Sequence, residues 1–317
     1  APKHMGKAYE YFLKASQNGS GYGSYSCGFI LMKGSSDIPR DIEKGLSMFR
    51  LAVEQNYKAA TRDLARYYYS LETEEDNRKA LDYYLQYIEY NPKDTDTLLH
   101  IGLIYESGLG VPLNIDLARR YYERAAEQDE TGMAYNFLGG TYMNDEETES
   151  NERKAVHYFQ KAIELGNTNA MFRISYYLHN GKGGLQVDIP REIELLTEAS
   201  KRGNHQATYR LGLLFEDNES GMAQNLELSV KYFQLAADNG ILAAINKMGE
   251  LYLFGEVIPA NLTKAISCFT AASEQGYGKA SYWLGRLHTD GIGQLEKDTQ
   301  KAMNYYRKAI EQGYEEA

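Results

Sequence analysis

Several features that would assign a chain to a broad class at once are scarce or missing here. Two cysteines are too few to hold a disulfide-rich scaffold together. No apolar run approaches the ~20 residues that span a bilayer, so no direct membrane insertion is expected. Lysine and arginine number 34 against 44 acidic residues. The resulting net charge of −10 argues against a protein that wraps a nucleic-acid backbone.

Motifs for catalysis are also missing. The six histidines are scattered and form neither an H-E-x-x-H pair nor a Cys/His cluster at metal spacing. The Gly-x-Gly turns at Gly108 and Gly291 lack the Gly-Lys-Ser/Thr ending of a phosphate loop, and no G-x-S-x-G elbow occurs. The acidic run 145–147 lacks the alternating oxygen ligands of a calcium loop and is interpreted as solvated. We therefore expect no enzyme, no cofactor and no metal.

Tyrosine, in contrast, is abundant, and it recurs at a fixed period. The 28 tyrosines, against one tryptophan, fall mostly in repeated aromatic positions. Residues 154–177 show the unit: a Lys-Ala helix with an aromatic pair, a glycine that ends it, and a second helix. No period-two alternation is sustained anywhere, so no strand is expected.

Two independent markers give the period. The small residue of one helix lies 36 or 37 residues from its next counterpart, at Gly28, Ala65, Gly102, Gly139, Ser175, Gly212, Gly249 and Gly285. The residue after the lysine of the other helix recurs 35 to 38 residues apart, at Ala8, Gly45, Ala80, Ala118, Ala155, Glu192, Ser229, Ala265 and Ala302. Repetition at this period predicts a solenoid of eight helix pairs, preceded by an unpaired helix near residues 7–18.

Packing explains the residue types at the markers. The small residue lets the partner helix of the same pair approach closely, and the large residue three positions later fills the space beside it. A glycine then ends the Lys-Ala helix in a left-handed cap, as at Gly166 and Gly203. Cys27 and Cys268 fall at a leucine and an aromatic position respectively. Both are therefore interpreted as unpaired core residues.

These motifs resemble the Sel-one-like repeat (SLR) family, relatives of the tetratricopeptide repeat. Residues 98–126, LLHIGLIYESGLGVPLNIDLARRYYERAA, match the pattern A-x-x-x-L-G-x-x-Y-x-x-G-x-G-V followed by D-x-x-K-A-x-x-Y-Y-x-x-A-A. The resemblance covers residues 7–317. It implies an all-α superhelix and a role as an adaptor, because the family serves as adaptors in many unrelated pathways.

The expected domain organisation is one SLR solenoid over residues 1–317, belonging to a longer protein. Residues 1–5 are interpreted as a remnant of cloning. Three N-glycosylation sequons occur, at Asn18, Asn218 and Asn261. About two are expected by chance in a chain this rich in Asn, Ser and Thr, so they leave the compartment open between the cytoplasm, which is slightly favoured, and a secreted or ER-luminal location.

In tetratricopeptide-like solenoids the first helix of each pair lines a concave face, with exposed positions three before, one after and four after the small residue. That offset selects a candidate partner surface: Tyr25, Phe29, Arg62, Arg66, Tyr69, Leu99, Phe172, Tyr176, His179, Tyr209, Tyr282 and Arg286. Tyrosine and arginine are enriched at interface centres. Arg62 and Arg66, one turn apart, suit an acidic or aromatic peptide segment. The alternative is that these two arginines pair with acidic residues of neighbouring helices.

The sequence thus predicts a non-enzymatic scaffold that binds a partner protein or an extended peptide in its concave groove. The alternative is an adaptor domain of a larger membrane or enzyme complex, such as an ER-associated degradation ubiquitin ligase, a role that the family resemblance implies.

Overall fold

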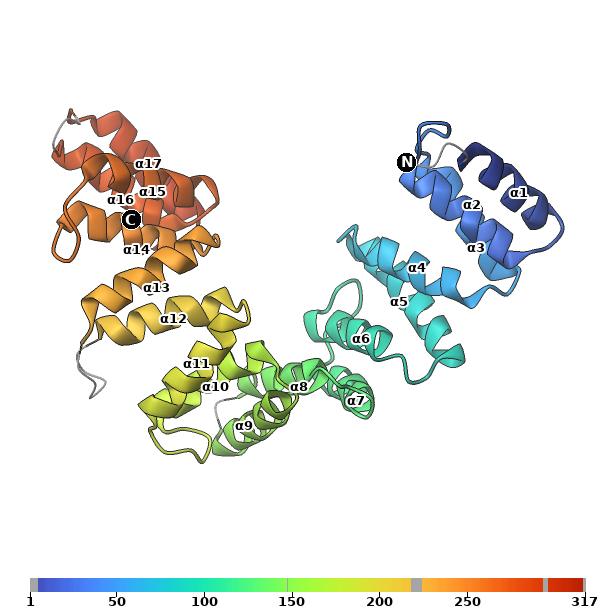
Figure 1. Ribbon diagram of the computed structural model, residues 1–317, viewed down its shortest axis with the longest axis horizontal. Coiled ribbons are helices and arrows are strands. Elements are labelled where there is room, and N and C mark those ends of the chain that lie inside the picture. Colours follow the sequence, from blue (N-terminus) through green and yellow to red (C-terminus); the bar gives the residue numbers. More distant parts are fainter. Residues whose placement is uncertain (1–4, 147, 218–223, 293–295, 316–317) are drawn as a thin grey trace. The chain divides into compact units, whose positions relative to one another are not determined.

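The computed structural model describes residues 5–146, 148–217, 224–292 and 296–315, and within them the chain forms seventeen helices and no strand. A second helix of an incomplete pair comes first, and eight complete pairs follow (Figure 1). The first helices of the pairs are α2 (Gly21–Lys33), α4 (Lys58–Tyr69), α6 (Thr95–Ser107), α8 (Met133–Met143), α10 (Thr168–Asn180), α12 (His205–Glu216), α14 (Leu242–Phe254) and α16 (Gly278–Asp290). The second helices are α1 (Met5–Gln17), α3 (Ile42–Glu54), α5 (Glu74–Tyr90), α7 (Ile115–Ala126), α9 (Glu149–Glu164), α11 (Ile189–Lys201), α13 (Leu226–Asp238), α15 (Leu262–Glu274) and α17 (Thr299–Glu311).

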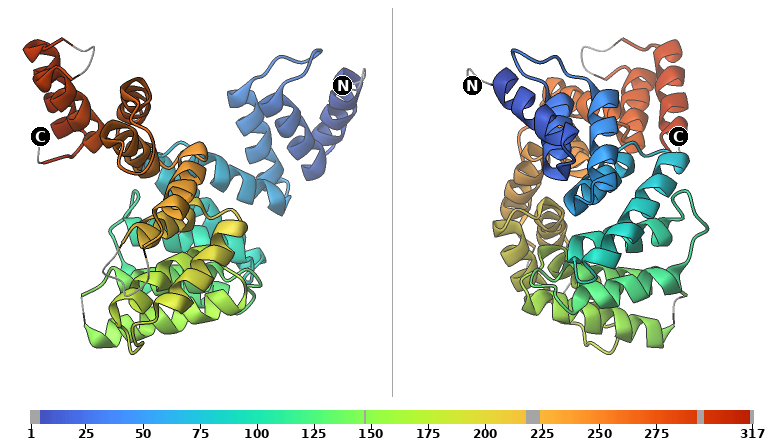
Figure 2. Two further views of the ribbon diagram at one scale, coloured as in Figure 1. Left: turned by 60° about the vertical axis from the view of Figure 1, so that its left-hand side comes forward. Right: turned by 90° about the vertical axis from the view of Figure 1, so that its right-hand side faces the viewer.

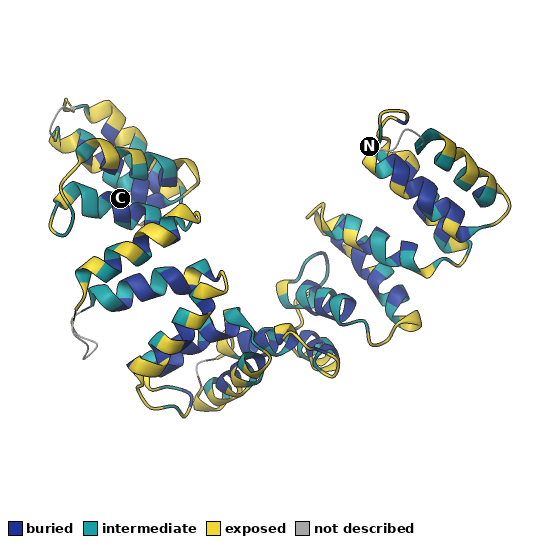
Figure 3. Cartoon of the chain, viewed as in Figure 1, coloured by how far each residue is buried: buried dark blue, intermediate teal, exposed yellow. Residues whose placement is uncertain are grey.

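The chain divides into two compact units, residues 1–167 with α1–α9 and residues 168–317 with α10–α17. Within each unit every helix packs against the helix before it and the helix after it. The views in Figure 2 show this for α1, α2 and α3. Within each unit, buried residues run along the helix sides that face neighbouring helices (Figure 3). The predicted all-α solenoid is confirmed.

The small marker residue lies where the two helices of a pair touch. A Cβ built on Gly28 would be 2.6 Å from Cδ1 of Phe49, and one on Gly249 would be 2.6 Å from Cε1 of Phe269. Such a separation is shorter than carbon atoms tolerate. Glycine is therefore required because the aromatic ring of the second helix occupies the space of its side chain.

A second aromatic layer lies beside this contact. The large residue three positions after the small one stacks on the residue that precedes the buried ring. The pairs are Tyr68–Tyr83, Tyr105–Tyr121, Tyr142–Tyr158, Phe215–Tyr232 and His288–Tyr305, with ring centroids 5.6–6.0 Å apart and interplanar angles of 4–11°. The marker lysine covers the same rings, since Lys79 lies over Tyr68 and Lys154 over Tyr142. These five pairs contain eight of the 28 tyrosines.

Helix ends follow the expected chemistry. Gly166 and Gly203 have φ of 78° and 88°, in the left-handed region that glycine tolerates. Asn or Asp caps the start of several second helices, as where Asp41 Oδ1 accepts from the Lys44 amide at 3.0 Å. The starts of α3, α7 and α13 are thus fixed locally.

The two cysteines differ from each other. Both are free, and Cys27 is fully buried, so the core interpretation is confirmed there. Burial raises the pKa of the Cys27 thiol to about 11. Cys268 is only half-buried, and the core interpretation is wrong for it, because its side chain lies at the outward position that tyrosine fills in other pairs.

Some sequence predictions fall outside the described residues: residues 1–4 of the proposed cloning remnant, Glu147 of the acidic run and the sequon asparagine Asn218. Met5 already belongs to α1. Within the described residues, no helix is both long enough and apolar enough to cross a membrane.

Candidate functional site

The offset rule selected twelve surface residues. In the structure, eleven of them lie at exposed or half-buried positions of first helices. The exposed ones are Phe29, Arg66, Tyr176 and Arg286. Half-buried are Tyr25, Arg62, Tyr69, Phe172, His179, Tyr209 and Tyr282. The prediction is wrong for Leu99, which is 6% exposed. It packs with Leu98 and Leu138, because α8 of the next pair covers this side of α6.

Helix α2 carries two exposed aromatic side chains. Tyr22 and Phe29 lie two turns apart and are 56% and 54% exposed. Between them, Tyr25 stacks on Phe49 and donates its hydroxyl to Asp63 at 2.7 Å. Burial and the Asp63 carboxylate raise the pKa of Tyr25. Tyr25 is therefore held in place. Tyr22 meets Phe12 and Tyr57 edge-on, with centroids 5.9 and 5.8 Å away, and like Phe29 it keeps more than half of its surface exposed. The sequence rule missed Tyr22, which lies one turn before its first offset.

The two arginines of α4 reach the next first helix. Arg66 Nη2 lies 2.6 Å from Asp96 Oδ2, and Arg62 Nη1 lies 3.8 Å from Asp94 Oδ2. The alternative interpretation, in which both arginines pair with neighbouring acidic residues, thus describes the geometry. Arg66 uses a single nitrogen in this pair and has no other partner in the described part of the chain. Its remaining donors face solvent and can bind a second carboxylate.

Tyr69 borders a cleft of about 370 Å³ at the end of α4. Ser70, Glu72, Asn77 and Leu109 complete its lining. Burial and the Glu72 carboxylate raise the pKa of Tyr69. Asn77 is 2% exposed, and its Oδ1 accepts no hydrogen bond within the described residues. The cleft therefore offers an acceptor to a hydrogen-bond donor.

In the second unit a buried carboxylate organises the polar contacts. Glu192 occupies the slot that holds Ala in most repeats and is fully buried. His179 Nδ1 lies 2.9 Å from one of its oxygens, and Arg210 donates to the other at 3.1 Å. Three helices, α10, α11 and α12, are joined at this point. The predicted surface residue His179 is thereby fixed to the core rather than free to bind.

Another polar cluster surrounds Glu250 on α14. Its Oε1 accepts from Trp283 Nε1 at 2.9 Å and lies 2.8 Å from Lys279 Nζ. Trp283 also stacks on Phe269, with Arg286 over its ring. The single tryptophan is therefore a structural bridge between α14 and α16. The marker spacing could not identify it, because it lies between two of the expected offsets.

No group of three or more His, Cys, Asp or Glu side chains is arranged to hold a metal ion in the residues that the structure describes.

Comparison with known proteins agrees with this architecture. The Sel1 repeat model matches nine segments, at residues 3–20, 22–57, 58–86, 97–130, 132–167, 168–204, 205–241, 242–277 and 278–314. Protein sel-1 homolog 2 of Rattus norvegicus is 41% identical over 75 residues, which are 24% of this chain and 11% of that protein. An uncharacterized protein of Neisseria meningitidis is 24% identical over 289 residues, which cover 88% of this chain and 56% of its own length. The chain thus matches about a tenth of the former and about half of the latter.

Two solved structures share the fold. A Sel1 repeat protein from Oxalobacter formigenes has a TM-score of 0.72 at 23% identity, covering 98% of this chain and 88% of its own. A protective antigen of uropathogenic Escherichia coli that displays an SLR fold has a TM-score of 0.66 at 20% identity, covering 96% and 64% respectively. Since the repeat model accounts for nearly every residue, the chain belongs to the Sel1 repeat family.

Proposed function

We propose that this chain is a scaffold whose first helices bind an extended segment of a partner polypeptide. Sel1 repeat proteins generally act as scaffolds for protein interactions. The observation that supports a binding role for α2 is the pair Tyr22 and Phe29, each more than half exposed on one side of the helix. Large exposed aromatic side chains at neighbouring positions are typical of interface centres.

The chemistry along the first unit indicates what the partner carries. An apolar or aromatic side chain covers Tyr22 and Phe29. A carboxylate binds the open donors of Arg66, and a hydrogen-bond donor enters the cleft beside Asn77. The partner segment is therefore amphipathic. The alternative function, an adaptor domain of a larger complex, adds other parts of a full-length polypeptide. It assigns the same surface of this chain to the partner.

The experiment selects peptides from a random library displayed on phage against the whole chain. Binding of the selected peptides is then measured by fluorescence polarisation. We expect the double variant Tyr22→Ser and Phe29→Ser to bind about tenfold more weakly, because truncation of a central aromatic residue costs about 2 kcal/mol of binding free energy. Arg66→Gln weakens peptides that contain Asp or Glu and leaves the others unchanged.

Tyr11→Ser provides the matched control, since Tyr11 is 72% exposed but lies on α1, a second helix. All variants are first checked for an unchanged thermal melting profile. Selected peptides that bind the Tyr22/Phe29 variant as tightly as the parent chain would contradict the proposal and direct attention to the second helices.

A further inference from the structure

One helix pair departs from the aromatic layer. Five pairs stack a ring of the first helix on a ring of the second, and two others match an aliphatic residue with another, Leu31 with Met48 and Leu178 with Leu195. In the α14–α15 pair the same two positions hold Tyr252 and Cys268. Tyr252 thus occupies the usual aromatic position of the first helix, whereas the second helix has the small side chain of Cys268 where five other pairs have a ring.

The register of this pair is the same as in the pair before it. A Cβ on Gly249 would lie 2.6 Å from Phe269 Cε1, just as one on Gly212 would lie 2.6 Å from Phe233 Cε1. Tyr252 is three residues after Gly249, and Cys268 directly precedes Phe269. Cys268 therefore holds the backbone position from which Tyr232 stacks on Phe215, with centroids 5.6 Å apart. Tyr252 packs at the edge of the cluster that contains Phe269, but among the described residues no aromatic ring stacks on it.

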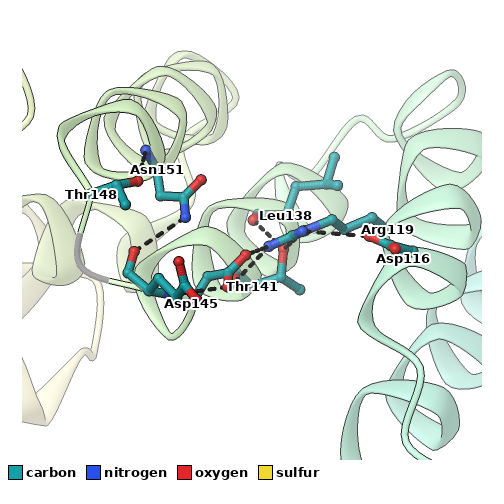
Figure 4. A network of polar contacts seen from close by, with 8 residues as sticks. Asp116, Arg119, Leu138, Thr141, Asp145, Thr148 and Asn151 are labelled. Carbon is teal, nitrogen blue, oxygen red and sulfur yellow. Dashed lines mark hydrogen bonds and ion pairs between the residues drawn. The ribbon is translucent and has the colours of Figure 1, made fainter.

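In the part of the chain that the structure describes, Tyr252 also has no arginine over its ring, as in every pair except α8–α9, because the corresponding position holds Leu, Val or Ile in most repeats. In the α8–α9 pair, Arg119 of the preceding second helix lies 3.9 Å over the Tyr142 ring. Figure 4 shows the same Arg119 reaching Thr141 and Asp145, with its Nη2 2.7 Å from Asp145 Oδ2. The position that corresponds to Arg119 ahead of Tyr252 holds Val230. A short apolar side chain there cannot cover the ring.

An open cleft of about 620 Å³ borders Tyr252, Val230 and Lys264, which lies one turn before Cys268. Its size falls in the range of ordinary ligand sites, about 300–1,000 Å³. Its lining comes from α13, the end of α14, the following loop and the start of α15: Val230, Lys231, Gln234, Leu235, Asp238, Met248, Tyr252, Ile258, Pro259, Ala260, Asn261 and Lys264. Most of these side chains are apolar, and Leu235 is 48% exposed.

We propose that this cleft binds a tyrosine side chain of a partner polypeptide, whose phenol ring stacks on Tyr252 where other pairs supply their own ring. The apolar walls of Val230, Met248 and Ile258 suit a planar ring. The Lys264 ammonium lies 5.1 Å from the Tyr252 centroid and pairs with no carboxylate in the part of the chain that the structure describes. It is therefore free to donate to the phenol oxygen, a contact that an aliphatic side chain cannot make.

This site is distinct from the surface that Tyr22 and Phe29 form on α2, because its lining comes from α13, α14, α15 and the loop between α14 and α15. The chain thus carries a second docking point, specific for one aromatic side chain. The inference rests on the cleft and on the comparison between repeats, and it holds whether or not Tyr22 and Phe29 bind a partner.

The test uses p-cresol and N-acetyl-L-tyrosine N-methylamide as probes of the phenol ring, titrated into the whole chain with 13C-methyl-labelled methionine. Met248 lines the cleft, so its methyl resonance reports binding at this site by NMR. We expect both probes to shift the Met248 signal with millimolar affinity, and 4-methylcyclohexanol, the saturated analogue of p-cresol, to bind about tenfold more weakly because it cannot stack.

Two variants place larger side chains beside Tyr252 from different helices. Cys268 does not line the cleft but lies one turn after Lys264, which does, so Cys268→Tyr adds the missing ring there. Val230→Arg adds a counterpart of Arg119. Each is expected to weaken binding of both probes about tenfold, while Met48→Tyr, the same substitution site in the α2–α3 pair, leaves it unchanged. Melting profiles establish that the variants are folded.

Three outcomes would overturn the proposal. In the first, the probes bind without moving the Met248 signal. In the second, 4-methylcyclohexanol binds as tightly as p-cresol. In the third, p-cresol binds but the capped tyrosine does not, which would make the cleft a site for free phenols rather than for a polypeptide side chain.

Discussion

At the scale of single residues, Glu192 is a buried charged residue at a position that holds alanine in most repeats. Burial of a lone carboxylate is costly, but Arg210 and His179 supply donors to both of its oxygens. The two partners come from the first helices on either side of α11. The charge is therefore part of how these three helices are held together.

We expect Arg210→Met to lower the free energy of unfolding by about 3 kcal/mol, because it leaves the buried Glu192 carboxylate without its cationic partner. Urea denaturation followed by circular dichroism measures the change. Arg286→Met is the control, since Arg286 faces the exposed Asp290 at 3.8 Å, and surface pairs of this kind contribute at most about 1 kcal/mol. Equal losses in the two variants would show that Glu192 does not depend on Arg210.

At the scale of elements, the pair of helices is the structural unit, and its geometry depends on a few positions. The small residue sets how close the two helices come, and the buried ring opposite it fills the contact. The stacked rings and the marker lysine then close the outer edge of the pair. Both aromatic layers thus lie between two helices of one pair, which is why the repeat preserves them together.

Gly249→Leu should destabilise the chain by about 1–3 kcal/mol or more, because the new side chain must enter space that the Phe269 ring occupies. Urea denaturation provides the measurement. Gly6→Leu is the matched control: the nearest atom to a Cβ there is 3.7 Å away, an ordinary contact, so little change is expected. An unchanged urea midpoint for Gly249→Leu would mean that the close contact has been misidentified.

At the scale of the whole molecule, contacts run almost entirely between consecutive helices. Stability in such an array is the sum of repeat terms and nearest-neighbour terms, so a local defect is felt first by the adjacent repeats. The chain divides into two compact units, residues 1–167 and 168–317, and this pattern of contacts holds within each of them.

Hydrogen exchange measured by mass spectrometry should therefore show a graded response to Gly249→Leu. We expect faster exchange in α13–α16 and unchanged exchange in α1–α3, because opening free energies follow local packing. A uniform increase along the chain would indicate that it unfolds as a single cooperative block and would contradict the nearest-neighbour description.

The sequence by itself determined the period, the eight helix pairs and the close contact of each pair, because these depend on residue types at fixed spacing within one repeat. The exposed positions of Phe29, Arg66 and Tyr176 also followed from that spacing. Each of these features depends on residues that are close in sequence or that hold equivalent positions in successive repeats.

Only the tertiary structure decided which of these surface residues are free. It buried Leu99 beneath α8, joined Arg66 to Asp96 and His179 to Glu192, and left an open cleft beside Tyr252. These outcomes depend on how one pair packs on the next, where individual side chains differ between repeats. A periodic pattern describes what the repeats share, whereas the packing of particular side chains decides where they differ.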